Sequence, residues 1–213
     1  MRSLGVVVMV ALLTGCGGTS VEESLDEAAE AVSSEVSAGT DRTCESGQAE
    51  LIEVGVDELS ANHIEPPASY PQCPAIGGDH FAFWQNCGFY TVPVIEGAAV
   101  HSLEHGAVWI TYNSSLVSVD ELSELEAMAA SNDKLLISPF DHDEKLVLSA
   151  WGIQQRTSAS PTDDVVAEFV ATWVDNPDLP EAGVTCRSAV GIPPLDVISF
   201  EGGEEQVPEE FRQ

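Results

Sequence analysis

The chain has 213 residues, of which 36 are acidic and 7 are basic, so its formal net charge at pH 7 is -29. The length suits one ordinary domain with extensions, and a hydrophobic content of 44% can fill a core, which excludes collagen-like repeats and a wholly disordered chain. A surface this acidic repels nucleic-acid phosphates, so the composition argues against nucleic-acid binding.

The N-terminus is typical of a secretory signal. Arg2 precedes the apolar run Leu4–Leu13, which is too short for a membrane span of about 20 apolar residues. The segment Leu13–Thr14–Gly15–Cys16 resembles the lipobox of bacterial lipoproteins, and this resemblance implies cleavage after residue 15 and acylation of Cys16. We therefore expect an exported protein that is held to the membrane by a lipid on Cys16 and faces the periplasm or the cell exterior. The alternative is an ordinary signal peptide followed by a cysteine.

Three further regions follow the signal peptide 1–15. Residues 16–42 are rich in Gly, Glu, Ala and Ser without an aromatic side chain, which predicts an acidic flexible tether. Residues 43–190 carry the aromatic and β-branched residues and form the predicted single domain. Residues 191–213 are rich in Pro, Gly and Glu and are expected to form a C-terminal tail.

The first half of the domain contains more loops than regular elements. Residues 62–98 are rich in proline, glycine and aromatic residues, which predicts ordered loops with short strands. Residues 107–112 have the composition of a strand. Residues 118–131 predict a helix, because Ser118 and Glu121 fit a capping box in which each side chain satisfies a backbone amide of the other residue.

The second half continues with two strands and a helix. The strands are expected at 134–138 and 145–151. A last helix is expected over 161–174, with Ser160 as its cap and Pro161 in its first position. Its apolar face follows helical spacing at Val165, Val166, Phe169, Val170, Trp173 and Val174. This order predicts an α+β fold with a small antiparallel sheet, two helices and a loop-rich, disulfide-linked half that bears the histidines.

Four cysteines remain besides Cys16, and an even number in an exported domain predicts two disulfides. Three pairings are possible; we favour a short loop between Cys73 and Cys87, with Cys44 bonded to Cys186. A metal site built from thiolates is the rival interpretation, but the chain has no Cys-x-x-Cys spacing.

The histidines carry the strongest chemical signal. His101 and His105 are four residues apart. On a helical turn their Cβ atoms are about 5–6 Å apart, which allows joint binding of one ion. On a strand they would lie about 13 Å apart. The metal hypothesis therefore requires a helical turn before the strand that starts at residue 107. His63 and His80 lie in the loop region upstream, and His142 lies in a charged turn, where we expect it to be only solvated.

Several motifs together resemble the bacterial domain of unknown function 3105 over roughly residues 60–186. They are Pro66–Pro67, Gly77–Gly78–Asp79–His80, Trp84, Gly88–Phe89–Tyr90, Pro93, Val100–His101–Ser102–Leu103–Glu104–His105–Gly106 and Ala150–Trp151–Gly152. The resemblance implies an exported or membrane-anchored domain whose histidines form the site. It implies no reaction.

The leading hypothesis is a lipid-anchored, extracytoplasmic protein that binds one transition-metal ion, Cu or Zn, and is not an enzyme. Its ligands would be His80, His101 and His105, with His63 as a candidate fourth, because imidazoles without thiolates suit Cu(II) or Zn(II). Glu104 would orient an imidazole from outside the ligand set.

Two alternatives remain open. The first is a zinc hydrolase, because His101–Ser102–Leu103–Glu104–His105 matches the His-x-x-Glu-His arrangement of inverted zincins, in which Glu104 would activate a water. The second is a binding or structural module in which the histidines only pack and form hydrogen bonds. A protein partner is not defined by the sequence.

Overall fold

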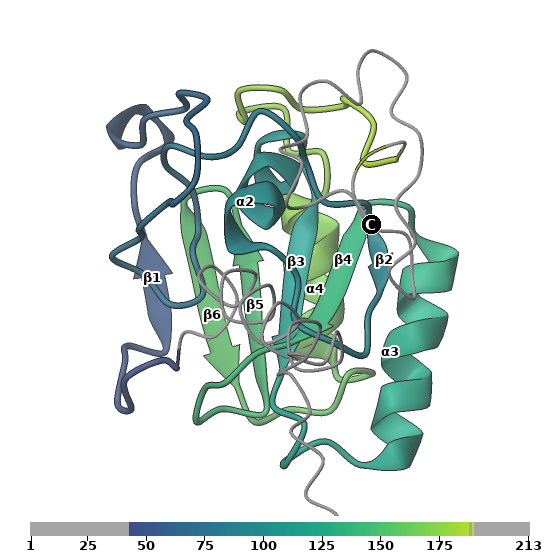
Figure 1. Cartoon of the computed structure of the whole chain (residues 1–213). Coiled ribbons are helices and arrows are strands. Elements are labelled where there is room, and N and C mark those ends of the chain that lie inside the picture. The colour runs from purple at the N-terminus through teal and green to yellow at the C-terminus, as the bar shows by residue number, and fades with distance from the viewer. Residues whose placement is uncertain (1–42, 188, 190–213) are drawn as a thin grey trace, which may run out of the picture. The chain divides into compact units, whose positions relative to one another are not determined.

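The computed structural model (Figure 1) describes residues 43–187 and residue 189. The predicted signal peptide 1–15, the tether 16–42 with Cys16, and the tail 191–213 lie outside the described residues. Among the described residues, no helix is long and apolar enough to cross a membrane.

A mixed sheet of six strands, in the order β1-β6-β5-β3-β4-β2, lies at the centre of the domain. The neighbours β3, β4 and β2 are parallel, whereas β3, β5, β6 and β1 are antiparallel. The strands are β1 (Leu51–Glu53), β2 (Gly88–Phe89), β3 (Val108–Tyr112), β4 (Leu135–Pro139), β5 (Leu146–Ala150) and β6 (Ile153–Thr157).

Three α-helices pack on this sheet. They are α2 (Glu96–Glu104), α3 (Val119–Ser131) and α4 (Asp164–Trp173), besides the short 3-10 helix η2 (Val56–Glu58). The helix α3 connects the parallel strands β3 and β4, and its predicted capping box is confirmed, since Ser118 and Glu121 each accept a hydrogen bond from the other's backbone amide.

The start of the last helix was predicted wrongly. The helix α4 begins at Asp164 with Asp163 as its N-cap, three residues after Pro161. The backbone amide of Ser160 donates to the Asp163 carboxylate at 2.8 Å, so the residues from 160 to 163 form a turn that precedes the helix.

Alternate residues of the central strands point to opposite faces of the sheet. Val108 and Ile110 belong to the core cluster that contains residues of α3 and α4, including Leu125 and Phe169. Trp109 points the other way and packs with residues of α2. In Figure 1, α2 accordingly lies in front of the sheet and α4 behind it. The face that carries α2 also carries the histidine-bearing loops.

The predicted α+β class is confirmed, and strands occur close to 107–112, 134–138 and 145–151. The sheet is larger than expected because β1 and β6 were not predicted, whereas β2 lies in the region 62–98 where short strands were expected. The sheet is mixed because the α3 crossover makes β3 and β4 parallel. The strand β6 has a polar sequence, Ile153–Thr157, yet Gln154 and Arg156 are buried. Their side chains donate to the backbone carbonyls of Pro74 and Cys73, which offsets part of the cost of burial, while Nε and Nη1 of Arg156 have no hydrogen-bond partner among the described residues.

Two disulfides are present, but the favoured pairing was wrong: Cys44 is bonded to Cys73, and Cys87 to Cys186. Cys73 lies beside β6, whereas Cys87 directly precedes β2 at the other half of the sheet. The chain from 74 to 86 therefore crosses the domain, and the two sulfurs cannot meet. Since all four cysteines form disulfides, the thiolate metal site is excluded, and the disulfides indicate folding in an oxidising, extracytoplasmic compartment.

Candidate metal centre

The helix α2 positions three polar side chains at the centre of the site. Every residue from Glu96 to Glu104 is buried, and the helix is followed by His105 as its C-cap. Gly106 then has φ +89°, a left-handed conformation that turns the chain into β3. His101, Glu104 and His105 thus lie within about one helical turn, as the metal hypothesis required. The helix itself is longer than the single turn that was expected.

Two further histidines reach α2 from the loop region. His63 and His80 form an isolated parallel bridge, in which the Ile64 amide donates to the His80 carbonyl at 2.8 Å and the His80 amide donates to the Asn62 carbonyl at 3.0 Å. This pairing fixes the two imidazole rings with centroids 5.2 Å apart. The His80 side chain is fully buried, whereas His63 is exposed.

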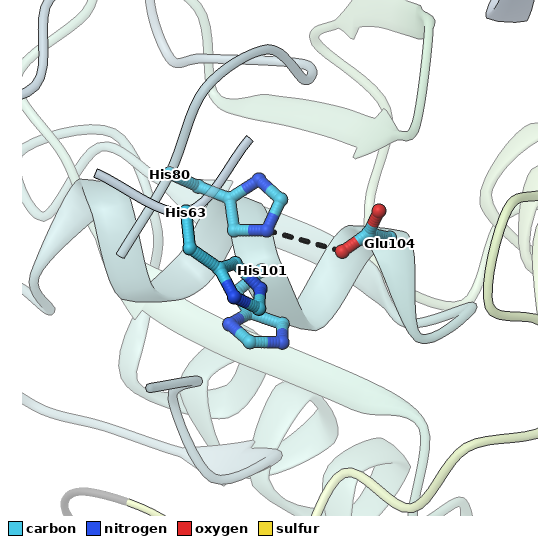
Figure 2. Close-up of side chains that lie close together, drawn as sticks. All are labelled: His63, His80, His101 and Glu104. Atoms are coloured by element: carbon cyan, nitrogen blue, oxygen red, sulfur yellow. Dashed lines mark ion pairs between the residues drawn. The ribbon is translucent and has the colours of Figure 1, made fainter. Parts of the chain in front are cut away.

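These residues form the inner group, defined as His63, His80, His101 and Glu104 (Figure 2). One candidate ligand atom from each residue lies within 4.8 Å of those of the other three. The His101 ring centroid is 4.7 Å from that of His80 and 4.8 Å from that of His63. Ligands of a tetrahedral zinc ion are about 3.3 Å apart, so metal binding needs only small side-chain movements.

Backbone carbonyls determine which ring nitrogens are available. The Nδ1 of His80 lies 2.8 Å from the Gly78 carbonyl, and the Nδ1 of His101 lies 2.7 Å from the Phe81 carbonyl. Because a carbonyl only accepts, each Nδ1 must carry the proton and donate it. In the neutral rings the Nε2 lone pairs are therefore free, which is the arrangement that metal-binding histidines commonly show.

The Nε2 of His80 lies 3.0 Å from the Glu104 carboxylate (Figure 2). This contact lacks hydrogen-bond geometry, so Nε2 has no hydrogen-bond partner among the described residues although it is buried. A lone pair and a carboxylate oxygen repel each other at this distance unless a proton or a metal ion lies between them. Because the Glu104 side chain is only 6% exposed, this contact needs either a shared proton or a metal ion between the two atoms.

Burial keeps the α2 histidines neutral. Desolvation lowers the pKa of His101 to about 3, and the neighbouring His105 and His80 lower it further. The pKa of His105 is also lowered, chiefly by its burial. At neutral pH both imidazoles are therefore neutral, with a lone pair on one ring nitrogen, which is the state that binds a metal ion.

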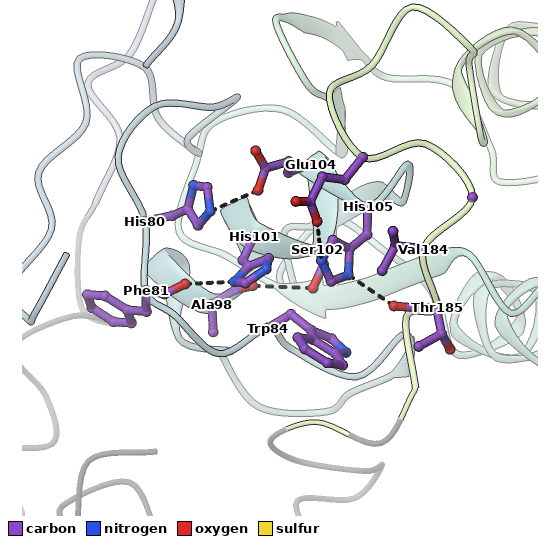
Figure 3. A network of polar contacts seen from close by, with 12 residues as sticks. His80, Phe81, Trp84, Ala98, His101, Ser102, Glu104, His105, Val184 and Thr185 are labelled. Carbon is purple, nitrogen blue, oxygen red and sulfur yellow. Dashed lines mark hydrogen bonds and ion pairs between the residues drawn. The ribbon is translucent and has the colours of Figure 1, made fainter. Parts of the chain in front are cut away.

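A second set of residues, the outer group, consists of His101, His105 and Glu181. Figure 3 labels its two histidines, with Trp84 and Thr185 nearby. The Nδ1 of His105 lies 3.0 Å from the Thr185 carbonyl, and its Nε2 lies 3.3 Å from the Glu181 carboxylate. The side chain of Glu181 is 49% exposed, in contrast to that of His105, which is buried. The ring of Trp84 lies beside both histidines, with centroids 5.6 Å from His101 and 4.9 Å from His105.

The segment after α4 brings Glu181 to the site. The backbone amide of Glu181 donates to the carbonyl of Glu104 at 3.3 Å, and the amide of Asp175 donates to the carbonyl of Gly106 at 2.9 Å. The disulfide at Cys186 holds the end of this segment. Sequence reasoning missed Glu181 because one acidic residue among 36, far from the histidines in the chain, carries no distinguishing signal.

A family model described as a protein of unknown function, DUF3105, matches residues 63–188, more than half of the chain. The chain belongs to the DUF3105 family. The predicted resemblance is thereby confirmed, and the matched segment contains every residue of the inner and outer groups. None of the curated proteins and none of the solved structures compared with the chain matches it.

The DUF3105 domain divides the predicted ligand set. His80 and His101 lie together with the candidate fourth ligand His63, whereas His105 pairs with His101 in the outer group. Glu104, expected to orient an imidazole from outside the ligand set, lies with one carboxylate oxygen 3.0 Å from the Nε2 of His80, while the Nδ1 of the same ring contacts the Gly78 carbonyl.

Two other side chains of the DUF3105 domain are fully engaged. His142 was expected to be solvated, but it is buried, with Nδ1 2.9 Å from the Glu144 carbonyl and Nε2 3.0 Å from the Thr111 hydroxyl. Ser102 is buried between the histidines of α2, and its hydroxyl donates to the Gln85 carbonyl at 2.7 Å. Ser102 is therefore not placed as a nucleophile.

Proposed function

We propose that this DUF3105 protein is an extracytoplasmic lipoprotein that binds one transition-metal ion, Cu(II) or Zn(II), in its inner group. The ligands are His80, His101 and Glu104, with the exposed His63 completing the set. The protein serves as a metal-binding protein rather than as an enzyme, in metal storage, delivery or sensing.

The contact between His80 and Glu104 carries this proposal. The Nε2 atom lies 3.0 Å from the carboxylate but is misaligned for a hydrogen bond. Two ligands of one zinc ion are separated by about 3.3 Å without any need to point at each other. A bound cation would remove the repulsion between the lone pair and the carboxylate, and it would also neutralise a buried negative charge.

The chemistry of the donor atoms limits the choice of metal. Three imidazoles and one carboxylate, without thiolate, favour Cu(II) or Zn(II) over soft Cu(I) and over the all-oxygen sites of Ca²⁺ or Mg²⁺. Copper is favoured by its higher intrinsic affinity for nitrogen ligands, whereas a tetrahedral arrangement favours zinc.

Attachment to the membrane rests on the N-terminus. The lipobox-like segment Leu13–Thr14–Gly15–Cys16 supports lipidation of Cys16, and the acidic residues 17–42 would act as a spacer between the lipid and the domain. The two disulfides agree with an exported location. Mass spectrometry of the membrane-extracted protein tests this part, since a diacylated N-terminal Cys16 supports it and an unmodified N-terminus contradicts it.

Elemental analysis tests the metal site. The full chain, purified without a histidine tag, is expected to contain about one Cu or Zn ion, or to take one up on dialysis against either metal. His101→Ala is expected to lose this ion, because His101 belongs to both groups, and His80→Ala is expected to hold it more weakly. His142→Gln is the matched control, because His142 is also buried but belongs to neither group. A metal-free wild type that takes up neither ion contradicts the metal site. It supports the alternative in which the histidines only pack and form hydrogen bonds.

A zinc hydrolase is the second candidate, because Glu181 offers an acidic ligand beside His101 and His105. In that case Glu104 would act as the general base. Glu104→Gln separates the two candidates: a hydrolase would keep its zinc and lose peptidase or esterase activity. The metal-binding proposal instead expects weaker metal binding and no activity in the wild type.

A further inference from the structure

The inner and outer groups share one side chain, His101. The Nδ1 of this residue is committed to the Phe81 carbonyl at 2.7 Å, so His101 has a single lone pair, on Nε2, for a metal ion. One lone pair binds one ion at a time. Two ions held tightly in both groups are therefore excluded, and repulsion between two dications would oppose such a state further.

The two groups also differ in their access to water. The outer group ends in Glu181, whose side chain is 49% exposed, whereas His80 and Glu104 of the inner group have side chains that are 0% and 6% exposed. A hydrated cation meets an exposed carboxylate first, because the carboxylate attracts it through its charge. His63 is exposed as well, but an imidazole carries no negative charge and lacks this long-range attraction.

We propose that the two groups are two successive positions of one metal ion. This inference rests on the proposed function. The ion first binds Glu181 and His105 in the outer group, gains His101 as a third ligand, and moves to His80 and Glu104 while it stays bound to His101. Release follows the reverse path. The centroids of His105 and His80 lie 4.5 Å and 4.7 Å from that of His101, so the shared ring stands beside both positions.

The proposal predicts separate effects on affinity and on rate. Glu181 belongs only to the outer position, so its loss should slow uptake and release without removing the ion from its final position. His80 belongs only to the inner position, so its loss should leave the ion weakly held by His101, His105 and Glu181. Arrival past His63 is the competing route, and it predicts no effect of Glu181 on the rates.

The test uses the full chain and Cu(II). Stopped-flow tryptophan fluorescence follows binding, since Trp84 lies beside His101 and His105, and removal by EDTA follows release. Glu181→Gln is expected to bind one Cu(II) per chain with a similar Kd, while its rates of uptake and release fall by about tenfold. Glu126→Gln, which removes the same charge from an exposed position on α3, is the control and should keep the wild-type rates.

The remaining measurements test whether the ion occupies the inner or the outer position. The electron paramagnetic resonance spectrum of Cu(II) in His80→Ala should differ from that of the wild type, because the ligands differ. Two Cu(II) ions bound equally tightly by the wild type, unchanged rates in Glu181→Gln, or loss of the bound ion from Glu181→Gln would each overturn the inference. A wild type that binds neither Cu(II) nor Zn(II) overturns the proposed function itself. This outcome differs from the three above, which overturn only the two-position inference.

Discussion

The side-chain ammonium of Lys134 donates a hydrogen bond to the backbone carbonyl of His105 at 2.7 Å, where α2 ends. The same ammonium contacts the Val184 carbonyl and the Asp175 carboxylate, each at 2.6 Å. Lys134 is buried at the start of β4. It therefore joins the helix that carries His101 to the segment that carries Glu181, and holds the two halves of the outer group together.

Replacing Lys134 by methionine should destabilise the domain by about 2–4 kcal/mol, because one buried and one partly buried carbonyl lose their donor and a partly buried ion pair is broken. Chemical denaturation in urea measures the change. Lys145→Met is the matched control, since Lys145 is the other lysine of the chain and pairs with the Glu121 carboxylate at 2.8 Å. A smaller loss is expected there, because among the described residues the Lys145 ammonium contacts a carboxylate and not a backbone carbonyl. Equal losses in the two variants would contradict the role of Lys134.

Gly106→Ala should destabilise the domain by about 2–4 kcal/mol. Gly106 has φ +89°, and an added Cβ would lie 2.6 Å from a carboxylate oxygen of Asp175 and 3.0 Å from its Cα. Gly183→Ala separates the two causes, because Gly183 has a similar φ of +85° with no atom within 4 Å of such a Cβ. Its cost should be only about 1 kcal/mol. A loss in Gly183→Ala as large as that in Gly106→Ala would show that the clash with Asp175 contributes nothing.

The disulfide between Cys87 and Cys186 should stabilise the domain more than the one between Cys44 and Cys73. The sequence separations are 99 and 29 residues, for which loop closure gives about 4–5 and about 3–4 kcal/mol, respectively. Paired cysteine-to-serine variants, unfolded in urea, measure both values. Peptide mapping under non-reducing conditions checks the pairing itself, and a peptide that links Cys73 to Cys87 would contradict the structure.

His142 should make the stability depend on pH in mildly acidic solution. Its burial lowers its pKa from 6.5 to about 4 in the folded domain. Below pH 6.5 the unfolded chain takes up a proton that the folded domain refuses, so this stabilisation is complete above pH 6.5 and is lost as the pH falls through about 4. The slope is at most about 1.4 kcal/mol per pH unit for one proton.

Urea unfolding of the wild type and of His142→Gln from pH 7 down to about pH 4 measures this effect, because the difference between the two curves removes the contributions of all other groups. The wild type should lose stability more steeply than the variant in this range. Parallel curves would show that His142 titrates alike in the folded and unfolded states.

Elements with local signals were predictable. The capping box of Ser118 and Glu121 depends on residues three apart, so the start of α3 was correct. The apolar run in β3 and the apolar face of α4 were also evident in the sequence. The strand β6 was not predicted because its sequence is polar. Its buried Gln154 and Arg156 donate hydrogen bonds to the carbonyls of Pro74 and Cys73, which are distant in the chain. The disulfide pairing was missed because it too depends on residues that are distant in the chain.

The sequence by itself determined the α+β class, the family, the two disulfides as a set, and the spacing that puts His101 and His105 on one helical turn. These features depend on composition or on neighbours within a few residues. Only the tertiary structure decided that Glu104 faces His80, that His105 joins Glu181, and that His101 is shared by two groups. Such relationships arise from the sheet topology and from the docking of the segment after α4, which bring together residues dozens of positions apart.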